Sequence, residues 1–263
     1  MSDHILKTME LSVQEKIATL TFTREKALNA MNQDFFNDFN DILETLSSND
    51  NIKALIITGK GNGFTVGADL KNLPINTELD LGKSLRENFL PMVMGIKKLN
   101  IPTIAAVNGY AAGAGMGLML ACDFTIAARN ANFVQAFINI ALVPDAGSSY
   151  FLPRLIGRAR ATEMMMLGEN ITAEDAYKIG LIYKVTEDDQ LMEQSLKLAN
   201  KLALKPSSAL IQIRELLDAS HENTLSEQLE AEAEAQAQQI AGKNENFLEG
   251  VAAFNEKRTP KFK

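Results

Sequence analysis

The stretch from Leu99 to Cys122, which carries no charged side chain, is the feature that most constrains the fold of this chain. An uncharged stretch of this length either crosses a membrane or lies inside a globular domain. This one contains Pro102, Asn108 and several glycines, which are typical of a buried strand, a turn and a short helix. A lipid-facing helix would not be built this way. The stretch therefore predicts a protein interior, and we expect no membrane association.

The rest of the N-terminal part alternates strands with helices. Residues 11–13 and 17–23 alternate apolar and polar side chains as a β-hairpin does, and Asn32 is placed to cap a helix that runs to Leu46. Further segments have the pattern of buried strands (54–58, 103–107 and 124–128), of helices (85–99, interrupted near Pro91, and 115–121), of a loop (59–67) and of a turn (108–112). Such alternation predicts βαβ units and a mostly parallel sheet.

The C-terminal part is predicted to be almost entirely helical. Six segments beyond Gly157 have helical spacing: 159–167, 173–179, 191–204, 207–219, 225–240 and 247–254. The glutamates between Glu222 and Glu249 indicate a solvated helix face. We therefore expect an α/β core over residues 1–195 and a C-terminal helical region over residues 196–263.

Composition excludes several classes of partner. The net charge of −7 and the pI near 5.1 argue against binding to nucleic acid or to an anionic membrane. Cys122 is the only cysteine, so no intrachain disulfide forms, and its apolar neighbours predict a buried thiol in a reducing, cytoplasmic compartment. The two histidines, His4 and His221, are far apart in the sequence, so we expect no metal site.

Asp145 is the one carboxylate between Asp123 and Glu163. Residues 132–143 before it are uncharged and read as core, and burial disfavours an ionised carboxylate, so its pKa would rise toward that of a general base. However, Asp145 also precedes Ala-Gly-Ser-Ser, which suits a helix N-cap that would lower its pKa. The residues alone leave these two interpretations equal.

Two glycine-rich loops, at 63–71 and 113–117, each follow a strand and precede a helix. The glycines at 113, 115 and 117 do not match the dinucleotide pattern G-x-G-x-x-G, and no lysine suits a phosphate-binding Walker loop. Free backbone N–H groups at such turns stabilise negative charge on a carbonyl oxygen. One N–H group from each loop would form an oxyanion hole, and two ordinary connections are the alternative.

Four segments, in order along the chain, resemble elements of the crotonase, or enoyl-CoA hydratase/isomerase, superfamily. Segment 24–31 is similar to R-P-x-A-x-N-A-(L/M), with Glu25 in place of the proline, and segment 64–70 resembles F-x-x-G-A-D-(I/L). Segment 106–115 resembles A-V-x-G-x-A-x-G-G-G, and segment 249–258 resembles E-G-x-x-A-F-x-E-K-R. The resemblance implies an α/β fold with a crotonase-like (ββα)n spiral core and a C-terminal helical extension.

The resemblance also implies an acyl-CoA thioester as substrate and no cofactor. The backbone N–H groups of Ala68 and Ala114 would hold the thioester carbonyl, although the family usually has glycine at position 114. Residues implied for the coenzyme A groove are Lys26, Leu28, Ala68, Asp69 and Leu70, completed by Phe254 and Lys257, and for the acyl pocket Met116 and Phe137. Phe254 and Lys257 are expected to come from a neighbouring subunit, because the family forms trimers and dimers of trimers. Asp69 is expected to act as a structural cap.

This chain departs from the hydratases of the superfamily, which use two glutamates to add water. Those positions hold Gly117 and Phe137, and neither can carry a proton. Segment 135–145 resembles instead a ring-1,2-epoxyphenylacetyl-CoA isomerase branch, in which a single Asp at the position of Asp145 does the acid–base work. Related enoyl-CoA isomerases have a Glu there. The resemblance therefore favours Asp145 as the catalyst and isomerisation as the reaction.

The predicted reaction moves a double bond of an acyl-CoA from the β,γ to the α,β position, or rearranges a ring-epoxide of phenylacetyl-CoA. One carboxylate suffices if it removes a proton at one carbon and returns it at another while the oxyanion hole holds the charge. Three alternatives stay open: residual hydratase activity, Asp145 as a nucleophile as in aryl-CoA dehalogenases, and a protein that binds acyl-CoA without catalysis.

Overall fold

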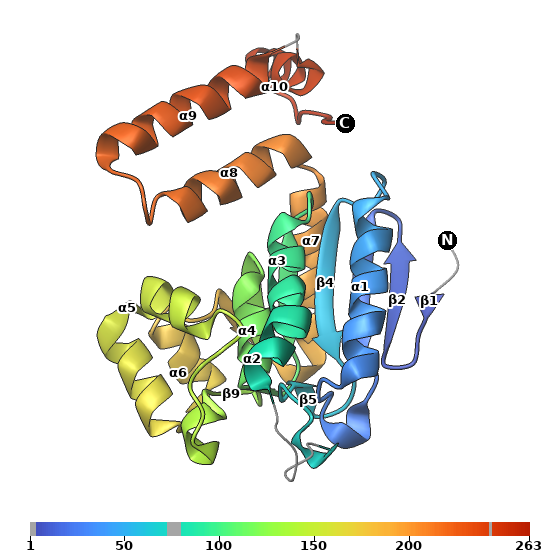
Figure 1. Cartoon of the computed structure of the whole chain (residues 1–263). Coiled ribbons are helices and arrows are strands. Elements are labelled where there is room, and N and C mark those ends of the chain that lie inside the picture. Colours follow the sequence, from blue (N-terminus) through green and yellow to red (C-terminus); the bar gives the residue numbers. More distant parts are fainter. Residues whose placement is uncertain (1–3, 73–79, 242–243) are drawn as a thin grey trace.

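The computed structural model describes residues 4–72, 80–241 and 244–263, and two β-sheets lie at its centre (Figure 1). The strands of the larger sheet are β1 (His4–Ile5), β2 (Met9–Gln14), β3 (Ile17–Phe22), β4 (Ala54–Gly59), β6 (Thr103–Val107), β8 (Phe124–Ala128) and β11 (Lys184–Thr186), in the order β1-β2-β3-β4-β6-β8-β11. The strands of the smaller sheet are β5 (Gly63–Thr65), β7 (Tyr110–Ala112), β9 (Asn132–Val134) and β10 (Asn170–Thr172), in the order β10-β9-β7-β5.

The chain passes repeatedly from the larger sheet to the smaller one. β4, β6 and β8 lie side by side and parallel in the larger sheet, and the strands that follow them, β5, β7 and β9, lie side by side and parallel in the smaller sheet. This repeat confirms the predicted (ββα)n spiral. The hairpin of β2 and β3 is also confirmed. The predicted loop over 59–67 and turn over 108–112 are wrong, because each contains a three-residue strand, β5 or β7.

Helices follow the strand pairs: α1 (Gln33–Ser47), α2 (Leu81–Ser84), α3 (Leu90–Lys98), α4 (Ala114–Ala121), α5 (Ser148–Leu167), α6 (Ala173–Lys178) and α7 (Leu191–Ala203), with short helices η1 (Glu25–Ala27), η2 (Leu70–Asn72), η4 (Ala136–Ile140) and η5 (Asp188–Gln190). Asn32 caps α1 as predicted, since its side chain accepts a hydrogen bond of 3.0 Å from the Phe35 amide. The interruption expected near Pro91 is a π-helical turn, η3 (Leu85–Phe89), which leads directly into α3. α5 begins well before the predicted residue 159 and is broken at Gly157, whose φ is +74°.

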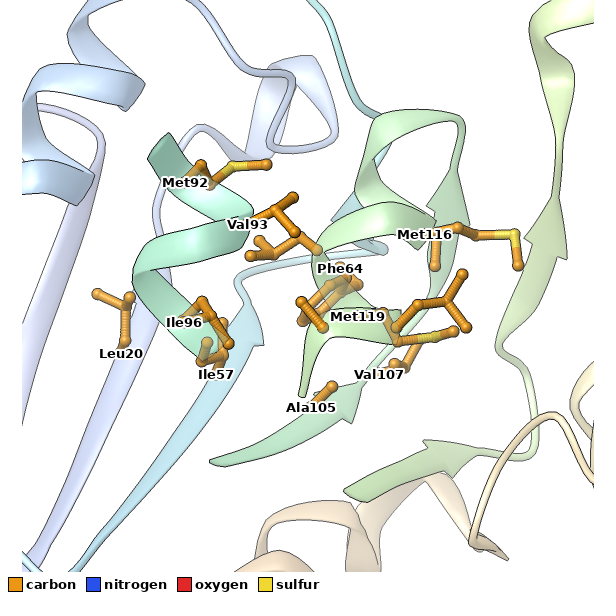
Figure 2. Close-up of a cluster of buried hydrophobic side chains, with 14 of the residues drawn as sticks. Leu20, Ile57, Phe64, Met92, Val93, Ile96, Ala105, Val107, Met116 and Met119 are labelled. Carbon is orange, nitrogen blue, oxygen red and sulfur yellow. The ribbon is translucent and has the colours of Figure 1, made fainter. Parts of the chain in front are cut away.

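The two faces of the larger sheet bury different side chains, because successive residues of a strand point to opposite sides. Leu55 and Ile57 of β4 join the cluster beneath α1, α3 and α4, part of which Figure 2 shows. Ala54 and Ile56 of the same strand join a second cluster with Leu191, Ala199 and Leu202 of α7. Because α7 covers the sheet in this way, the boundary proposed at residues 195 and 196 falls within a helix of the core. The division into 1–195 and 196–263 stays a prediction.

The uncharged stretch forms the interior, as expected. Every residue of β6 and every residue of α4 is buried, and a helix that is apolar on all sides belongs in a protein core. At its end, burial raises the pKa of the Cys122 thiol to about 12, so the thiol stays protonated at neutral pH. Within the described part of the chain, none of the helices combines the length and apolar character needed to cross a membrane.

The last three helices, α8 (Ser207–Ala219), α9 (Leu225–Ile240) and α10 (Glu245–Glu256), lie together beyond one end of the core (Figure 1). Arg214 of α8 ties them to it. Its guanidinium donates two hydrogen bonds of 2.6 Å to the Asp123 carboxylate, and further bonds of 2.7 and 2.8 Å to the carbonyl oxygens of Leu99 and Ile101. Lys97 and Asp218 form a second ion pair nearby, at 2.8 Å.

The expectation that residues 132–143 all belong to the core is wrong for the second half of the segment. Phe133 and Phe137 are buried, but Ile140 is 50% exposed and Val143 is 79% exposed. After β9 the chain leaves the small sheet and runs along the surface as η4, so its apolar side chains no longer alternate between two covered faces. An uncharged segment therefore does not by itself indicate burial.

Candidate functional site

The two glycine loops meet at the first turn of α4. A Cβ atom placed on Gly67 would lie 2.9 Å from the amide nitrogen of Ala114 and 3.0 Å from the carbonyl oxygen of Ala112, and φ at Gly67 is +79°. Both the space and the backbone angle therefore require glycine at this position. This close approach brings the segment that follows Gly67 against the N-terminus of α4.

The amide N–H groups of Ala68 and Ala114 are free where their neighbours are bonded. Met31 donates to the Gly67 carbonyl at 2.7 Å, Asp69 donates to the Met31 carbonyl at 2.9 Å, and Gly113 donates to the Val134 carbonyl at 3.0 Å. Among the described residues no acceptor pairs with the N–H of Ala68 or Ala114. Ala114 opens α4, where helix geometry leaves N–H groups unpaired and the helix dipole favours negative charge. The arrangement suits stabilisation of an oxyanion.

We expect Gly67→Ala to weaken this donor pair. The new Cβ would stand 2.9 Å from the Ala114 nitrogen, so one loop must move, and the side chain would crowd the N–H group of Ala114. Loss of one such donor lowers kcat about 100-fold or more. Steady-state kinetics with a thioester substrate measure the effect. Gly250→Ala on α10 is the control, because its Cβ would find only ordinary contacts, 3.6 Å or more from Phe262. Equal kcat values for Gly67→Ala and the unmodified enzyme would contradict the assignment.

Asp145 lies on a tight turn before α5. The Ser148 amide donates to the Asp145 carbonyl oxygen at 2.9 Å, and φ is +47° at Ala146 and +81° at Gly147, as in a mirror-image β-turn. α5 begins at Ser148 with Gly147 as its N-cap residue, and no side chain caps the helix. The helix-cap interpretation of Asp145 is therefore wrong, because Gly147 occupies the N-cap position and no described side chain accepts a hydrogen bond from the first N–H groups of α5.

The Asp145 carboxylate is desolvated without compensation. Its Oδ1 atom is buried and has no hydrogen-bond partner in the described chain. Burial raises the pKa of Asp145 from an ordinary 3.8 to about 6. The side chain lines a cavity of about 340 Å³, whose other wall comes from η3 and α3, including Phe89 and Val93. A carboxylate with this pKa, beside a largely apolar cavity, can exchange protons near neutral pH.

The residues expected in the acyl pocket lie close to the first turn of α4. Phe137 is 6% exposed, and its ring lies 3.7 Å from the point where a Cβ of Gly113 would stand, so it borders the turn. Met116 has no exposed surface and belongs to the hydrophobic cluster, near Met119 and Val107 (Figure 2). In the structure described here, Met116 therefore contributes to the core beneath the site.

Two polar residues that the sequence patterns did not reveal lie next to Met116. Gln135 and Ser148 are completely buried, and the Gln135 Nε2 atom donates to Ser148 Oγ at 3.3 Å and to the Met116 sulfur at 3.5 Å. The only signal in the sequence was the presence of polar side chains in an otherwise apolar region. Gln135 thereby connects α4 to the start of α5, immediately after the turn of Asp145.

The segments expected to line the coenzyme A groove are joined along their lengths. Besides the bonds of Met31, the Asn29 side chain donates to the Gly63 carbonyl at 2.7 Å, and the Thr65 hydroxyl donates to the Asn29 carbonyl at 2.7 Å. The structure thereby brings the Lys26–Leu28 region beside the loop that carries Ala68 to Leu70. Lys26 is exposed, and Leu28 and Leu70 are 37% and 47% exposed.

Asp69 has the geometry of a structural residue. Its Oδ2 atom accepts a hydrogen bond of 2.7 Å from Arg24 Nη2, and its Oδ1 atom accepts one of 3.3 Å from the Lys71 amide. The hydrogen bond from Arg24 holds the pKa of Asp69 below its ordinary value. These bonds agree with the expected capping role and leave Asp69 poorly suited to proton transfer. The sequence patterns did not single out Arg24 as a partner of Asp69, although it is the first residue of segment 24–31.

Phe254 and Lys257 are not brought to the groove within this chain. Phe254 lies on α10 with 84% of its surface exposed, and Lys257 follows at the end of that helix. Figure 1 shows α10 at the opposite end of the molecule from β5. These two residues reach a groove only if it belongs to another copy of the chain.

Comparisons with known proteins agree with this architecture. The model of the enoyl-CoA hydratase/isomerase family matches residues 12–263. The chain is 39% identical over 253 residues to the 1,2-epoxyphenylacetyl-CoA isomerase of Escherichia coli K12, covering 95% of this chain and 96% of that protein. It is 36% identical to the 2,3-dehydroadipyl-CoA hydratase of the same organism, covering 96% and 97% of the two chains. The crystal structure of an enoyl-CoA hydratase from Bacillus anthracis is similar with a TM-score of 0.89 and 31% identity, covering 98% and 99%.

These matches extend over nearly the whole chain and include the crotonase-type loops that meet at α4. Some of these relatives are named isomerases and others hydratases. The similarity therefore establishes the family and does not distinguish between the two reactions. The chain therefore belongs to the enoyl-CoA hydratase/isomerase family.

Proposed function

We propose that this enzyme isomerises an acyl-CoA thioester, with Asp145 as the acid and base and the N–H groups of Ala68 and Ala114 as the oxyanion hole. The reaction is either the transfer of a double bond from the β,γ to the α,β position or the rearrangement of a ring-epoxide of phenylacetyl-CoA. One observation carries the proposal. The Oδ1 atom of the Asp145 carboxylate is buried and unpaired among the described residues, burial raises the pKa of Asp145 to about 6, and Asp145 lines a cavity together with residues of η3 and α3.

The proposed mechanism needs only these groups. The two N–H donors stabilise the negative charge that develops on the thioester oxygen when a proton leaves the adjacent carbon or its vinylogue. Asp145, ionised above pH 6, accepts the proton and then returns it to another carbon of the dienolate. Hydration would also require a group that activates water, and Gly117 and Phe137 supply none at the positions where hydratases have glutamate.

We infer that coenzyme A lies across Lys26, Leu28, Ala68 and Leu70, and that assembly into a homotrimer or a dimer of trimers completes the groove. The exposure of Phe254 supports this inference, because a large apolar side chain with 84% of its surface in water is better placed against another chain. A cytoplasmic location is proposed on the sequence evidence alone, from the single cysteine.

The proposal predicts that activity depends on ionisation of Asp145. The general base must be unprotonated, so kcat/KM should rise with pH through an apparent pKa of about 6 and level off above it. A pH–rate profile between about pH 3.5 and 8.5, roughly 2.5 units to either side of this pKa, measures the dependence. An acid limb near 4, the value of an exposed aspartate, would show that the working group is not the buried carboxylate.

The test is a panel of β,γ-enoyl-, α,β-enoyl- and ring-epoxide phenylacetyl-CoA thioesters, incubated in deuterated water. We expect product formation with deuterium in the acyl group for at least one substrate, and isomerisation faster than hydration. Faster hydration throughout the panel would instead assign a hydratase. Tight binding of every thioester without turnover would show a protein that binds acyl-CoA but does not catalyse.

A further inference from the structure

We propose that Gly117 is the positioning residue for Asp145, because the absence of a side chain at Gly117 allows the turn that carries Asp145 to dock directly on α4. This inference rests on the proposed role of Asp145 as the acid and base. It concerns what holds that carboxylate at the site.

The contact between the turn and the helix leaves no room for a side chain. A Cβ atom placed on Gly117 would lie 2.4 Å from the carbonyl oxygen of Ala146 and 2.5 Å from its Cβ. Both distances are far below a van der Waals contact, and one of the opposing atoms belongs to the backbone. A change of rotamer therefore cannot relieve the overlap, and the turn itself would have to move.

The turn depends on this support because one of its residues, Ala146, has a backbone conformation that costs free energy. Ala146 has φ of +47°, a conformation that glycine adopts easily and that an L-residue with a Cβ disfavours. Such a conformation persists only where the surrounding structure imposes it. α4 provides one support at Gly117. Ser148 provides the other, since its amide donates to the Asp145 carbonyl and its hydroxyl accepts from Gln135.

Glycine at position 117 thus has two consequences at once. It removes the glutamate that hydratases of the superfamily have at this position, and it provides the space in which Ala146 seats the turn of Asp145. A glutamate at position 117 would overlap with Ala146, so it could not be present while the turn holds Asp145 in its present place. The two acids are therefore mutually exclusive in this backbone, and the residue at 117 decides which of them can act.

Gly117→Ala tests the inference. The displaced turn should open Asp145 to water, so the acid limb of the pH–rate profile should move from about 6 toward the ordinary value of 3.8. A misplacement of the base by about 1 Å lowers kcat about 100-fold, while KM should change little because the coenzyme A groove lies on other loops. The matched control is Gly95→Ala on α3, where the new Cβ would press on Leu43 Cδ1, the end of a flexible side chain. This control should keep the pH profile of the unmodified enzyme.

Ala146→Gly provides a variant that retains the space at Gly117. Glycine accepts a positive φ without cost, so the folded state should be kept, but the turn loses its methyl contact with α4 and becomes free to move. In the double variant with Gly117→Ala, the glycine at 146 removes one of the two overlaps, so part of the lost kcat should return. Ala146→Gly alone should shift the acid limb in the same direction as Gly117→Ala, by a smaller amount.

The outcomes separate this inference from the proposed function. An unchanged acid limb in both Gly117→Ala and Ala146→Gly, together with inactivity of Asp145→Asn, would overturn the role of Gly117 and leave the function in place. Full activity of Asp145→Asn would remove the proposed function and this inference with it. If Gly117→Ala does not fold, the pH profile of Ala146→Gly alone decides between the two results.

Discussion

Asp145→Asn should lower the rate of proton exchange between a thioester substrate and water about 1,000-fold, within the range typical of a lost general base. The change replaces one oxygen by an NH2 group of similar size, so the turn and the cavity keep their shape while the group that carries the proton is lost. Deuterium incorporation followed by mass spectrometry measures the exchange. Calorimetric binding of a non-reactive acyl-CoA should give a dissociation constant close to that of the unmodified enzyme.

The same variant should be at least as stable as the unmodified enzyme above pH 6. Because burial raises the pKa of Asp145 from 3.8 to about 6, the folded chain binds a proton more tightly than the unfolded chain does. The free energy of unfolding therefore falls as the pH rises through this window, and the ionised carboxylate is a cost above it. Asparagine carries no such cost. Thermal unfolding at pH 5 and pH 8 should show that the loss of activity does not come from a loss of structure.

Asp41→Asn is the control for this experiment, since Asp41 is an exposed aspartate on α1. It should keep the full exchange rate. Oxygen-18 appearing in the carboxylate of Asp145 after a single turnover would assign a nucleophile in place of a base. If Asp145→Asn exchanged substrate protons with water at the rate of the unmodified enzyme, the proposed mechanism would be wrong.

Arg214→Ala should destabilise the chain by about 3–5 kcal/mol, the usual effect of removing one partner of a buried ion pair. The guanidinium is 9% exposed and donates hydrogen bonds to both oxygens of Asp123 and to the backbone carbonyls of Lys97, Leu99 and Ile101. Its removal leaves the Asp123 carboxylate, which is 17% exposed and lies just before β8, without an ion partner among the described residues and with hydrogen bonds from Thr103 alone. Urea unfolding gives the free energy. Hydrogen exchange should show the amides of α8 losing protection first, because Arg214 is the main polar link between that helix and the core.

Lys97→Ala is the matched control for Arg214→Ala. Lys97 also pairs with a residue of α8, but its partner Asp218 is 46% exposed, and exposed pairs contribute about 1 kcal/mol or less. Equal effects of the two substitutions would contradict the view that the buried pair anchors α8. A loss of catalytic activity in Arg214→Ala without any loss of stability would also contradict it.

The sequence predicted most long elements of this fold, with the first half of α5 as the exception, and it missed the short strands β5 and β7 for a physical reason. β6 and β8 are five-residue, largely apolar strands, bounded by a proline and an asparagine in β6 and by charged residues in β8, so their limits could be read directly. β5 and β7 have three residues each and lie in glycine-rich segments, where neither periodicity nor propensity distinguishes a strand from a loop. Their pairing becomes visible only when the segments 63–65 and 110–112 lie side by side.

The candidate site divides in the same way. The motifs placed Ala68 and Ala114 in loops after strands, and the structure brings those loops together. Asp145 would be the N-cap residue of α5 only if the helix began at residue 146. The helix begins two residues later, at Ser148, and Gly147 is its N-cap residue. The contact of Gly117 with Ala146 could not be read from the chain, because it joins two segments whose separation in space is set by the whole core.

The hydrogen bonds between segments 24–31 and 63–71 have a consequence for protein engineering. Arg24 and Met31 of the first segment donate hydrogen bonds to Asp69 and Gly67 of the second. The two segments therefore form one structural unit, although a helix and a strand separate them in the chain. A chimera that exchanges only segment 63–71 between related enzymes would contain this loop without the segment 24–31 that holds it in place. Loop grafts intended to alter substrate range should therefore take both segments from the same donor enzyme.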